Sequence, residues 1–144
     1  MKVFIQNETG SFVRHDYNEK TLELLGESRV SRAFPFPYGF LLDTTAPDGD
    51  NVDCFVLTSK RLRTGQIVDC EPLGLMEKIE DGEEDHKVLA TLYGEEGTLD
   101  DQARKILTEF ETHVFDHILG KTIVLGAFHG REVALRYVEA HASS

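Results

Sequence analysis

Short apolar segments separated by polar turns make up the first two thirds of the chain. Residues 38–45 and 52–58 are apolar runs joined by APDGDN, whose Asp, Gly and Asn residues are typical of a tight turn. The other expected strands are 2–5, GSFVRH and TLELL around a turn at DYNEK, 66–79 and 86–93, with an acidic turn EDGEED before the last. Evenly spaced short strands favour a small barrel or a strongly curled antiparallel sheet.

From residue 98 onward the apolar spacing becomes that of a helix. Thr98 and Asp101 suit the N-cap and N3 positions, and Gly120 followed by Lys121 suits the end of the helix. Between these signals, residues at helical spacing form one apolar stripe: Ala103, Leu107, Phe110, Val114 and Ile118. The sequence therefore predicts one long helix that packs on the sheet.

Two further elements complete the predicted fold. Residues 122–128 have the pattern of one more strand, and 131–141 have the pattern of a short amphipathic helix. The predicted class is α+β, with a barrel-like sheet and helices packed outside it, in a single domain over residues 1–144.

Charge and cysteine content exclude several classes of function. The chain has 15 Lys plus Arg against 26 Asp plus Glu, a formal net charge of −11, which disfavours nucleic acid and anionic membranes as partners. An anionic substrate would also be repelled unless cations intervene. Cys54 and Cys70 fit no metal or redox motif, and the N-terminal apolar segment is too short for a signal peptide, so we expect a cytoplasmic protein.

Three aspartates in the sequence PDGDNVDCFVLT, residues 47–58, are the first candidates for chemistry. Asp48 and Asp50 are ordinary turn residues, and a hairpin turn alone would explain them. Asp53 is different because strand alternation places it on one face with Phe55 and Leu57. A carboxylate on a half-buried face needs a positive partner or a metal.

The type of metal follows from the residues around the turn. A calcium loop starting at Asp48 is excluded, because Val52 and Asp53 stand at its fifth and sixth positions and Ser59 stands where Glu should close it. Oxygen ligands without a full cage indicate Mg²⁺ or Mn²⁺ instead.

A second acidic turn, residues 80–85, has the same form. Alone it would be interpreted as a solvated hairpin. Asp85 precedes the next strand and is two residues from Lys87, so the two share a strand face. Two acidic turns at neighbouring strand ends are able to hold two metal ions, with Lys87 as a point charge for a phosphate oxygen.

The combination of PYGF, DGDNVDCFVLT and GQIVDCEPLGLMEKIEDGEEDHKVLA resembles the family I soluble inorganic pyrophosphatases. The resemblance implies a five-stranded OB-like β-barrel with helices outside. It implies hydrolysis of the small anion pyrophosphate to two phosphates with Mg²⁺ (Mn²⁺ as the alternative) in the cytoplasm. Bacterial members of the family form hexamers, which makes a homo-oligomer the suggested assembly.

The resemblance also assigns roles to single residues. Asp50 corresponds to the group that deprotonates the attacking water, and Glu80 replaces a metal-binding aspartate. The remaining metal ligands and the substrate contacts correspond to Asp48, Asp53 and Asp85, and to Lys87 and Tyr38. Two bound cations would lower the pKa of a shared water and neutralise charge on the phosphoryl oxygens.

Much of the family's phosphate clamp has no counterpart at ungapped positions. The clamp positions fall on Val3, Phe12, Val13, Arg14, Gly26, Phe34, Val114 and Phe115. Small gaps would let Arg14, Arg29 or Arg32 supply the missing charge. Otherwise the chain is a divergent relative that hydrolyses a different phosphate compound, or a non-catalytic metal- or phosphate-binding protein on the same fold.

One further pair of residues has metal-ligand spacing. His113 and His117 are four residues apart on the predicted long helix, as in some zinc sites. Because no Glu stands beside them in the H-E-x-x-H order, packing or a subunit contact is the favoured role.

Overall fold

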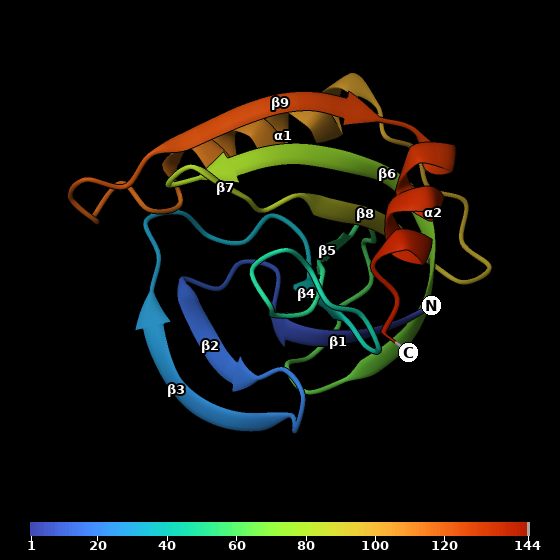
Figure 1. Cartoon of the computed structure of the whole chain (residues 1–144), viewed down its shortest axis with the longest axis horizontal. Coiled ribbons are helices and arrows are strands. Elements are labelled where there is room, and N and C mark those ends of the chain that lie inside the picture. The colour runs from blue at the N-terminus through green and yellow to red at the C-terminus, as the bar shows by residue number, and fades with distance from the viewer. Residues whose placement is uncertain (144) are drawn as a thin grey trace.

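Five strands close into a ring in the computed structural model, which describes residues 1–143 (Figure 1). In ring order they are β1 (Lys2–Asn7), β4 (Tyr38–Leu41), β5 (Asp53–Val56), β8 (Lys87–Leu92) and β6 (Ile67–Glu80), and β1 pairs with both β4 and β6. The β5–β8 pairing is parallel and the other pairings in the ring are antiparallel. The ring confirms the predicted class; the predicted domain end, residue 144, lies outside the described residues.

The remaining elements surround this ring. Figure 1 shows α1 and β9 lying over β6, α2 at one side, and the β2–β3 hairpin on the opposite side. Their bounds are β2 (Val13–Asn18), β3 (Glu23–Arg29), β7 (Glu83–Glu84), α1 (Asp101–His113), β9 (Ile123–His129) and α2 (Arg131–Ala140). Within residues 1–143, neither helix has the length and apolar character needed to cross a membrane.

Strand alternation divides the apolar side chains into two cores. Val52, Cys54 and Val56 point into the ring, where Ala134 of α2 covers them. Phe55, on the opposite face of β5, packs outside the ring against Phe110 and other residues of α1. The alternation predicted for residues 52–57 is therefore confirmed, and it places Asp53 on the outer face.

Gly39 of the PYGF segment is required by the closeness of two strands. β4 and β1 pair with Gly39 opposite Ile5, and a Cβ built on Gly39 would lie 1.7 Å from the carbonyl oxygen of Phe4. Any side chain would therefore push the backbones apart. The neighbouring Tyr38 begins β4 and pairs with Asn7 of β1.

The long helix is shorter than predicted at both ends. Its N-cap is Asp100, whose carboxylate accepts a hydrogen bond from the Ala103 amide at 2.8 Å, so the assignment of Thr98 as cap and Asp101 as N3 is wrong. The helix ends at His113 because Ser31 takes over the bonding of the next turn. The Ser31 amide donates to the Val114 carbonyl at 2.9 Å, and its Oγ accepts from the His117 amide at 3.1 Å.

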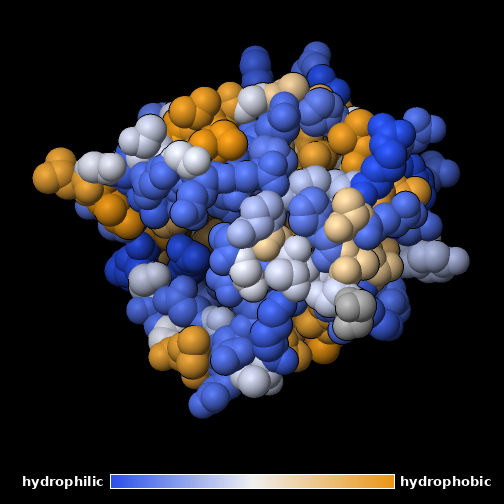
Figure 2. Space-filling view, in the orientation of Figure 1, coloured by the Kyte–Doolittle hydropathy of each residue, from blue (hydrophilic) through white to orange (hydrophobic). Residues whose placement is uncertain are grey.

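The apolar stripe of that helix therefore ends before Ile118. Figure 2 shows an apolar projection at the left edge, over the loop that joins α1 to β9. In this loop Ile118 is 43% exposed and Leu119 is fully exposed, so the prediction of Ile118 as a packed helical residue is wrong.

The turn predicted at DYNEK also begins later than expected. β2 continues to Asn18, whose side-chain oxygen accepts hydrogen bonds from the amides of Lys20 and Thr21, each at 3.0 Å. Such an Asx turn places the reversal at residues 19–22. The shift is important because it puts Glu19 at the tip of the hairpin, facing the loop that contains Asp48 and Asp50.

Candidate active site

A cavity of about 140 Å³ lies outside the strand ring, beside the end of α1. The residues that the sequence singled out come from separate segments of the chain, yet all of them line this cavity: Tyr38, Asp48, Asp50, Asp53, Glu80, Asp85 and Lys87. The structure therefore brings the predicted residues together in one place, while their individual roles remain predictions.

The parallel pairing of β5 and β8 builds the centre of the cavity. Asp53 and Lys87 are register partners, and the Lys87 Nζ atom lies 2.7 Å from Asp53 Oδ2. The same ammonium group lies 3.1 Å from Asp85 Oδ2 and donates to the Tyr38 hydroxyl at 2.9 Å. Lys87 is thus the positive partner that the half-buried Asp53 was expected to need.

Burial and neighbouring charges shift the pKa values of this cluster. Burial raises the pKa of Asp53, Lys87 opposes the rise and the adjacent Asp85 carboxylate adds to it, and the result is a pKa of about 6. Burial acts in the same direction on Asp85, but Lys87 and Lys78 outweigh it and lower the pKa of Asp85. Burial disfavours the charge of Lys87, yet Asp53, Tyr38 and Asp85 hold its pKa well above the ordinary value, so it stays protonated.

The acidic loop beside this cluster is a well-formed turn. The Asp50 amide donates to Asp48 Oδ1 at 3.0 Å, the Ala46 amide donates to the Asp50 carbonyl at 2.7 Å, and Gly49 has a φ of +89°. Turn chemistry therefore does explain the backbone around Asp48 and Asp50. Both residues are exposed, so their carboxylates stand at the mouth of the cavity.

The tip of the β2–β3 hairpin holds the acidic loop in place. Glu19 Oε1 accepts a hydrogen bond from the Asn51 amide at 2.9 Å, and the Lys20 ammonium donates to the Thr44 carbonyl at 3.0 Å. Burial, together with the nearby carboxylates of Asp53 and Asp50, raises the pKa of Glu19 to about 8. This contact could not be predicted from the sequence, because it depends on where the hairpin turns.

A second lysine, Lys78 of β6, enters the cavity. Its Nζ lies 3.0 Å from Glu80 Oε1, 2.6 Å from Glu111 Oε2 and 3.6 Å from Asp85 Oδ2. The other oxygen of Glu80 lies 3.2 Å from Lys121 Nζ. Sequence reasoning missed Lys78 and Glu111, although a glutamate four residues after Leu107, on the apolar stripe of the helix, was a usable signal.

Arg14 is the arginine that reaches the cavity among the three considered. Arg29 and Arg32 lie outside its lining, and the Arg32 guanidinium instead lies 4.0 Å from Glu109. The Arg14 guanidinium lies 5.8 Å from the centre of the Phe115 ring. Burial acts to lower the pKa of Arg14, but Tyr38 and Asp16 outweigh it and the pKa is raised.

The sequence matches the family described as inorganic pyrophosphatase over residues 3–142. The chain belongs to the inorganic pyrophosphatase family. It is 30% identical to the inorganic pyrophosphatase of Halalkalibacterium halodurans, over 96% of this chain and 91% of that protein. It is 28% identical to the inorganic pyrophosphatase of Thermoplasma volcanium, over 93% of this chain and 86% of that protein. The structure of the inorganic pyrophosphatase of Coxiella burnetii superposes with a TM-score of 0.88 at 25% identity. The superposition covers 98% of this chain and 92% of that one.

Membership in the inorganic pyrophosphatase family confirms the resemblance and makes the chain a relative of phosphoanhydride hydrolases. Four apolar residues stand at positions of the family's phosphate clamp, and the structure places them in different surroundings. Val3 lies in the core inside the ring and Phe12 is 45% exposed. Phe34 and Phe115 line the cavity, so the apolar residues at these two positions face the site.

The cavity has the donor chemistry of a site for hard divalent cations. It is lined by nine carboxyl groups and by three cationic side chains, those of Arg14, Lys78 and Lys87. Carboxylate oxygens suit Mg²⁺ and Mn²⁺, and the excess of negative charge favours cation binding. Within residues 1–143, no three His, Cys, Asp or Glu side chains stand in a ready metal-binding arrangement, because lysines occupy several of the carboxylates.

The two histidines with zinc-like spacing bind different partners. His113 Nδ1 lies 2.8 Å from Asp116 Oδ2, and His117 Nδ1 lies 2.6 Å from Ser31 Oγ. The first residue of the pair therefore belongs to a surface ion pair and the second to the contact that ends α1. A packing role, favoured from the sequence, agrees with these contacts.

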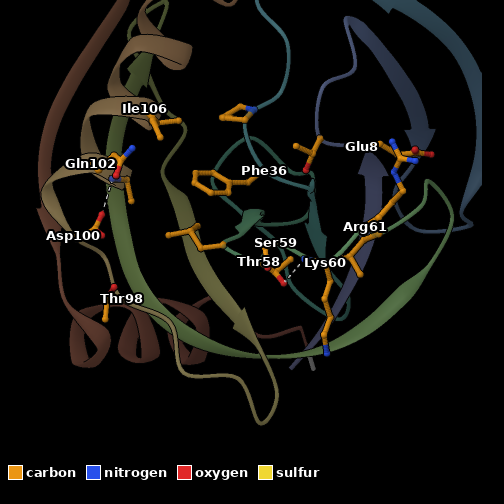
Figure 3. A pocket seen from close by; sticks show the side chains of 15 residues that line it. Glu8, Phe36, Thr58, Ser59, Lys60, Arg61, Thr98, Asp100, Gln102 and Ile106 are labelled. Atoms are coloured by element: carbon orange, nitrogen blue, oxygen red, sulfur yellow. Dashed lines mark hydrogen bonds between the residues drawn. The ribbon is translucent and has the colours of Figure 1, made fainter.

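A larger groove of about 570 Å³ lies at the other end of α1 (Figure 3). Figure 3 shows Phe36 at its floor, Lys60 and Arg61 at one wall, and Asp100 at the opposite wall. Asp100 is used as the helix cap, and Lys60 Nζ lies 3.5 Å from Glu95. We place the chemistry in the smaller cavity, because the clustered carboxylates and lysines lie there.

Proposed function

We propose that this protein hydrolyses inorganic pyrophosphate to two phosphates in the cavity beside β5 and β8. The observation that carries the proposal is the convergence of Tyr38, Asp50, Asp53, Asp85 and Lys87 on one cavity, from segments far apart in the chain. The relatives named inorganic pyrophosphatase, which match nearly the whole chain, support the same substrate.

Divalent cations have a defined place in the proposal. Asp48, Asp53 and Asp85, with Glu80, would hold Mg²⁺ or Mn²⁺ in the cavity. When bound, such cations supply Lewis acidity and lower the pKa of a bound water toward neutrality. They also explain how a chain with a net charge of −11 accepts an anion.

The protein's own groups have separate tasks in the reaction. Asp50, exposed at the cavity mouth, orients the attacking water and accepts its proton. Lys87 stays protonated and Tyr38, whose pKa burial and Asp53 raise well above the ordinary value, keeps its hydroxyl proton. Both therefore donate hydrogen bonds to phosphoryl oxygens, from atoms that lie 2.9 Å apart.

A second candidate is hydrolysis of a different phosphate compound by the same groups. The observation that favours it is the cavity wall, where Phe34 and Phe115 stand at positions that carry polar clamp residues in the family. Apolar walls suit a substrate with a less charged or bulkier substituent on phosphate. Arg14 supplies part of the missing charge and argues for pyrophosphate.

Phosphate release tests both candidates. The wild type, Asp50→Asn and the control Asp43→Asn are compared with pyrophosphate and Mg²⁺ or Mn²⁺. Asp43 is exposed, lies outside the cavity and has a φ of 58°, which Asn tolerates. We expect release by the wild type and the control, and loss of release in Asp50→Asn.

Release only from other phosphoanhydrides or esters would replace pyrophosphate by the second candidate. Absence of turnover, with Mg²⁺ still raising the melting temperature, would leave a non-catalytic metal-binding protein and overturn both enzymatic proposals.

A further inference from the structure

Lys78 carries an enclosed charge in the cavity. Its side chain is 2% exposed, and its ammonium group lies between Glu80 Oε1 at 3.0 Å and Glu111 Oε2 at 2.6 Å, with Asp85 Oδ2 at 3.6 Å. These three carboxylates come from β6, from α1 and from the residues before β8. A small positive charge surrounded by oxygens from three segments has the setting of a bound metal ion.

Glu111 fixes this lysine from the helix side. It is 2% exposed, and its Oε2 lies in an ion pair with Lys78. Among residues 1–143 this buried oxygen has no hydrogen bond of regular geometry, so the Lys78 charge is what compensates it. A buried carboxylate without compensation is costly, and Lys78 is therefore held in the cavity by α1.

The other lysines near the cavity have different surroundings. Lys87 contacts the neutral hydroxyl of Tyr38 as well as carboxylates, which suits a group that turns to substrate. Lys121 is about a quarter exposed, and its Nζ lies near Glu80 Oε2, Asp81 and the Phe115 ring. The ionic partners of Lys78 are three carboxylates, its Nζ lies 5.6 Å from the centre of the Phe115 ring, and its side chain is 2% exposed.

We propose that the Lys78 ammonium group takes the place of one divalent cation, so that the site binds fewer metal ions than its carboxylates would otherwise hold. The inference rests on the proposed function in one respect, that divalent cations bind to these carboxylates. Two of the carboxylates that Lys78 occupies, Glu80 and Asp85, are among the proposed ligands. A lysine needs no free metal, so it supplies this charge at any metal concentration.

The test is the number of Mn²⁺ ions bound per chain, measured by titration calorimetry and by the electron paramagnetic resonance signal of free Mn²⁺. Lys78→Met is compared with the wild type, with Lys78→Arg and with Lys2→Met. The last is a matched control, since it removes the same charge from an exposed pair with Asp69, where both side chains are about 60% exposed.

We expect Lys78→Met to bind one Mn²⁺ more than the wild type, while Lys78→Arg and Lys2→Met bind the wild-type number. Equal numbers in all four proteins overturn the inference. If Lys78→Met does not fold, the double variant Lys78→Met with Glu111→Gln removes the buried pair together. We expect it also to bind an additional Mn²⁺, because Glu80 and Asp85 are freed, and a wild-type number overturns the inference.

Phosphate release by the wild type, measured in the same buffer, separates this inference from the proposed function. Release of phosphate together with equal Mn²⁺ numbers refutes the role of Lys78 and leaves the proposed function standing. An additional Mn²⁺ in Lys78→Met without release of phosphate supports the role of Lys78 and removes the proposed function.

Discussion

The cavity has two halves that are built in different ways. In the strand half, Asp53 and Lys87 are fixed by the register of two parallel strands and are largely buried. In the loop half, Asp48 and Asp50 stand on an exposed turn that is held by its own backbone and by the β2–β3 hairpin. Fold stability and charge placement are therefore linked in the strand half, whereas side chains in the loop half can be replaced at little cost in stability.

The largest effect is expected from Lys87→Met, which breaks the strand half. The substitution leaves the carboxylates of Asp53 and Asp85 near each other without their shared cation. Removing one partner of a buried ion pair typically lowers the free energy of unfolding by about 3–5 kcal/mol. Urea unfolding in metal-free buffer measures the change. A loss below about 1 kcal/mol, the level of exposed ion pairs, would contradict the described burial of this cluster.

Gly39→Ala tests the scaffold of the strand half without touching a charge. A Cβ at this position would lie 1.7 Å from the Phe4 carbonyl oxygen, so β1 and β4 must separate. We expect a loss of unfolding free energy at or above the upper end of the roughly 1–3 kcal/mol typical of overpacking. Gly26→Ala is the matched control, since a Cβ there meets nothing within 4 Å, and it should leave stability unchanged. Equal melting temperatures for the two variants would refute the close approach.

Asp48→Asn tests the loop half of the cavity. Asn keeps the oxygen that accepts the Asp50 amide, so the turn persists and the unfolding free energy should change by less than about 0.5 kcal/mol. The lost charge weakens metal binding, and we expect the dissociation constant for Mn²⁺ to rise at least about 10–100-fold, the cost of losing even an outer-shell partner. Calorimetric titration checks the affinity. Destabilisation without a change in affinity would reverse the assignment of this half.

The smallest effect concerns Glu19, which joins the hairpin to the loop half. Its pKa is about 8 in the folded chain against 4.5 in the reference state, so the folded protein binds the proton more tightly. The stabilisation from this proton is complete below pH 4.5 and is lost as the pH rises to about 8.

Glu19→Gln has no such proton, and Gln keeps an oxygen for the Asn51 amide. In metal-free buffer, the unfolding free energy of the wild type should therefore fall relative to Glu19→Gln across this pH range. Urea unfolding at several pH values measures the difference, and a difference that stays constant with pH would contradict the burial of Glu19 among the aspartates.

The sequence predicted the strand half well because that half depends on local rules. Alternation placed Asp53 and Phe55 on one face of β5. The spacing of Asp85 and Lys87 predicted that both share one face, and both line the cavity, although Asp85 lies just before β8. The strands of the ring were found for the same reason, since each carries its own apolar pattern and ends in a turn.

The features that the sequence missed depend on contacts between distant segments. Lys78 and Glu111 lie 33 positions apart and meet only because α1 packs over β6. The early end of α1 depends on Ser31, which has no mark in the helical pattern itself. Pairwise contacts of this kind carry no periodic signal, so composition and spacing do not reveal them.

Hydrolysis of pyrophosphate by this protein is tested by following pyrophosphate itself with ³¹P nuclear magnetic resonance. The wild-type protein is incubated with pyrophosphate and Mg²⁺, and a parallel sample contains a chelator in excess over the metal. We predict that the pyrophosphate resonance disappears only in the sample with free Mg²⁺, while the orthophosphate resonance grows by two phosphates for each pyrophosphate lost. A pyrophosphate resonance that persists in the presence of Mg²⁺ would contradict the proposal that this protein hydrolyses pyrophosphate.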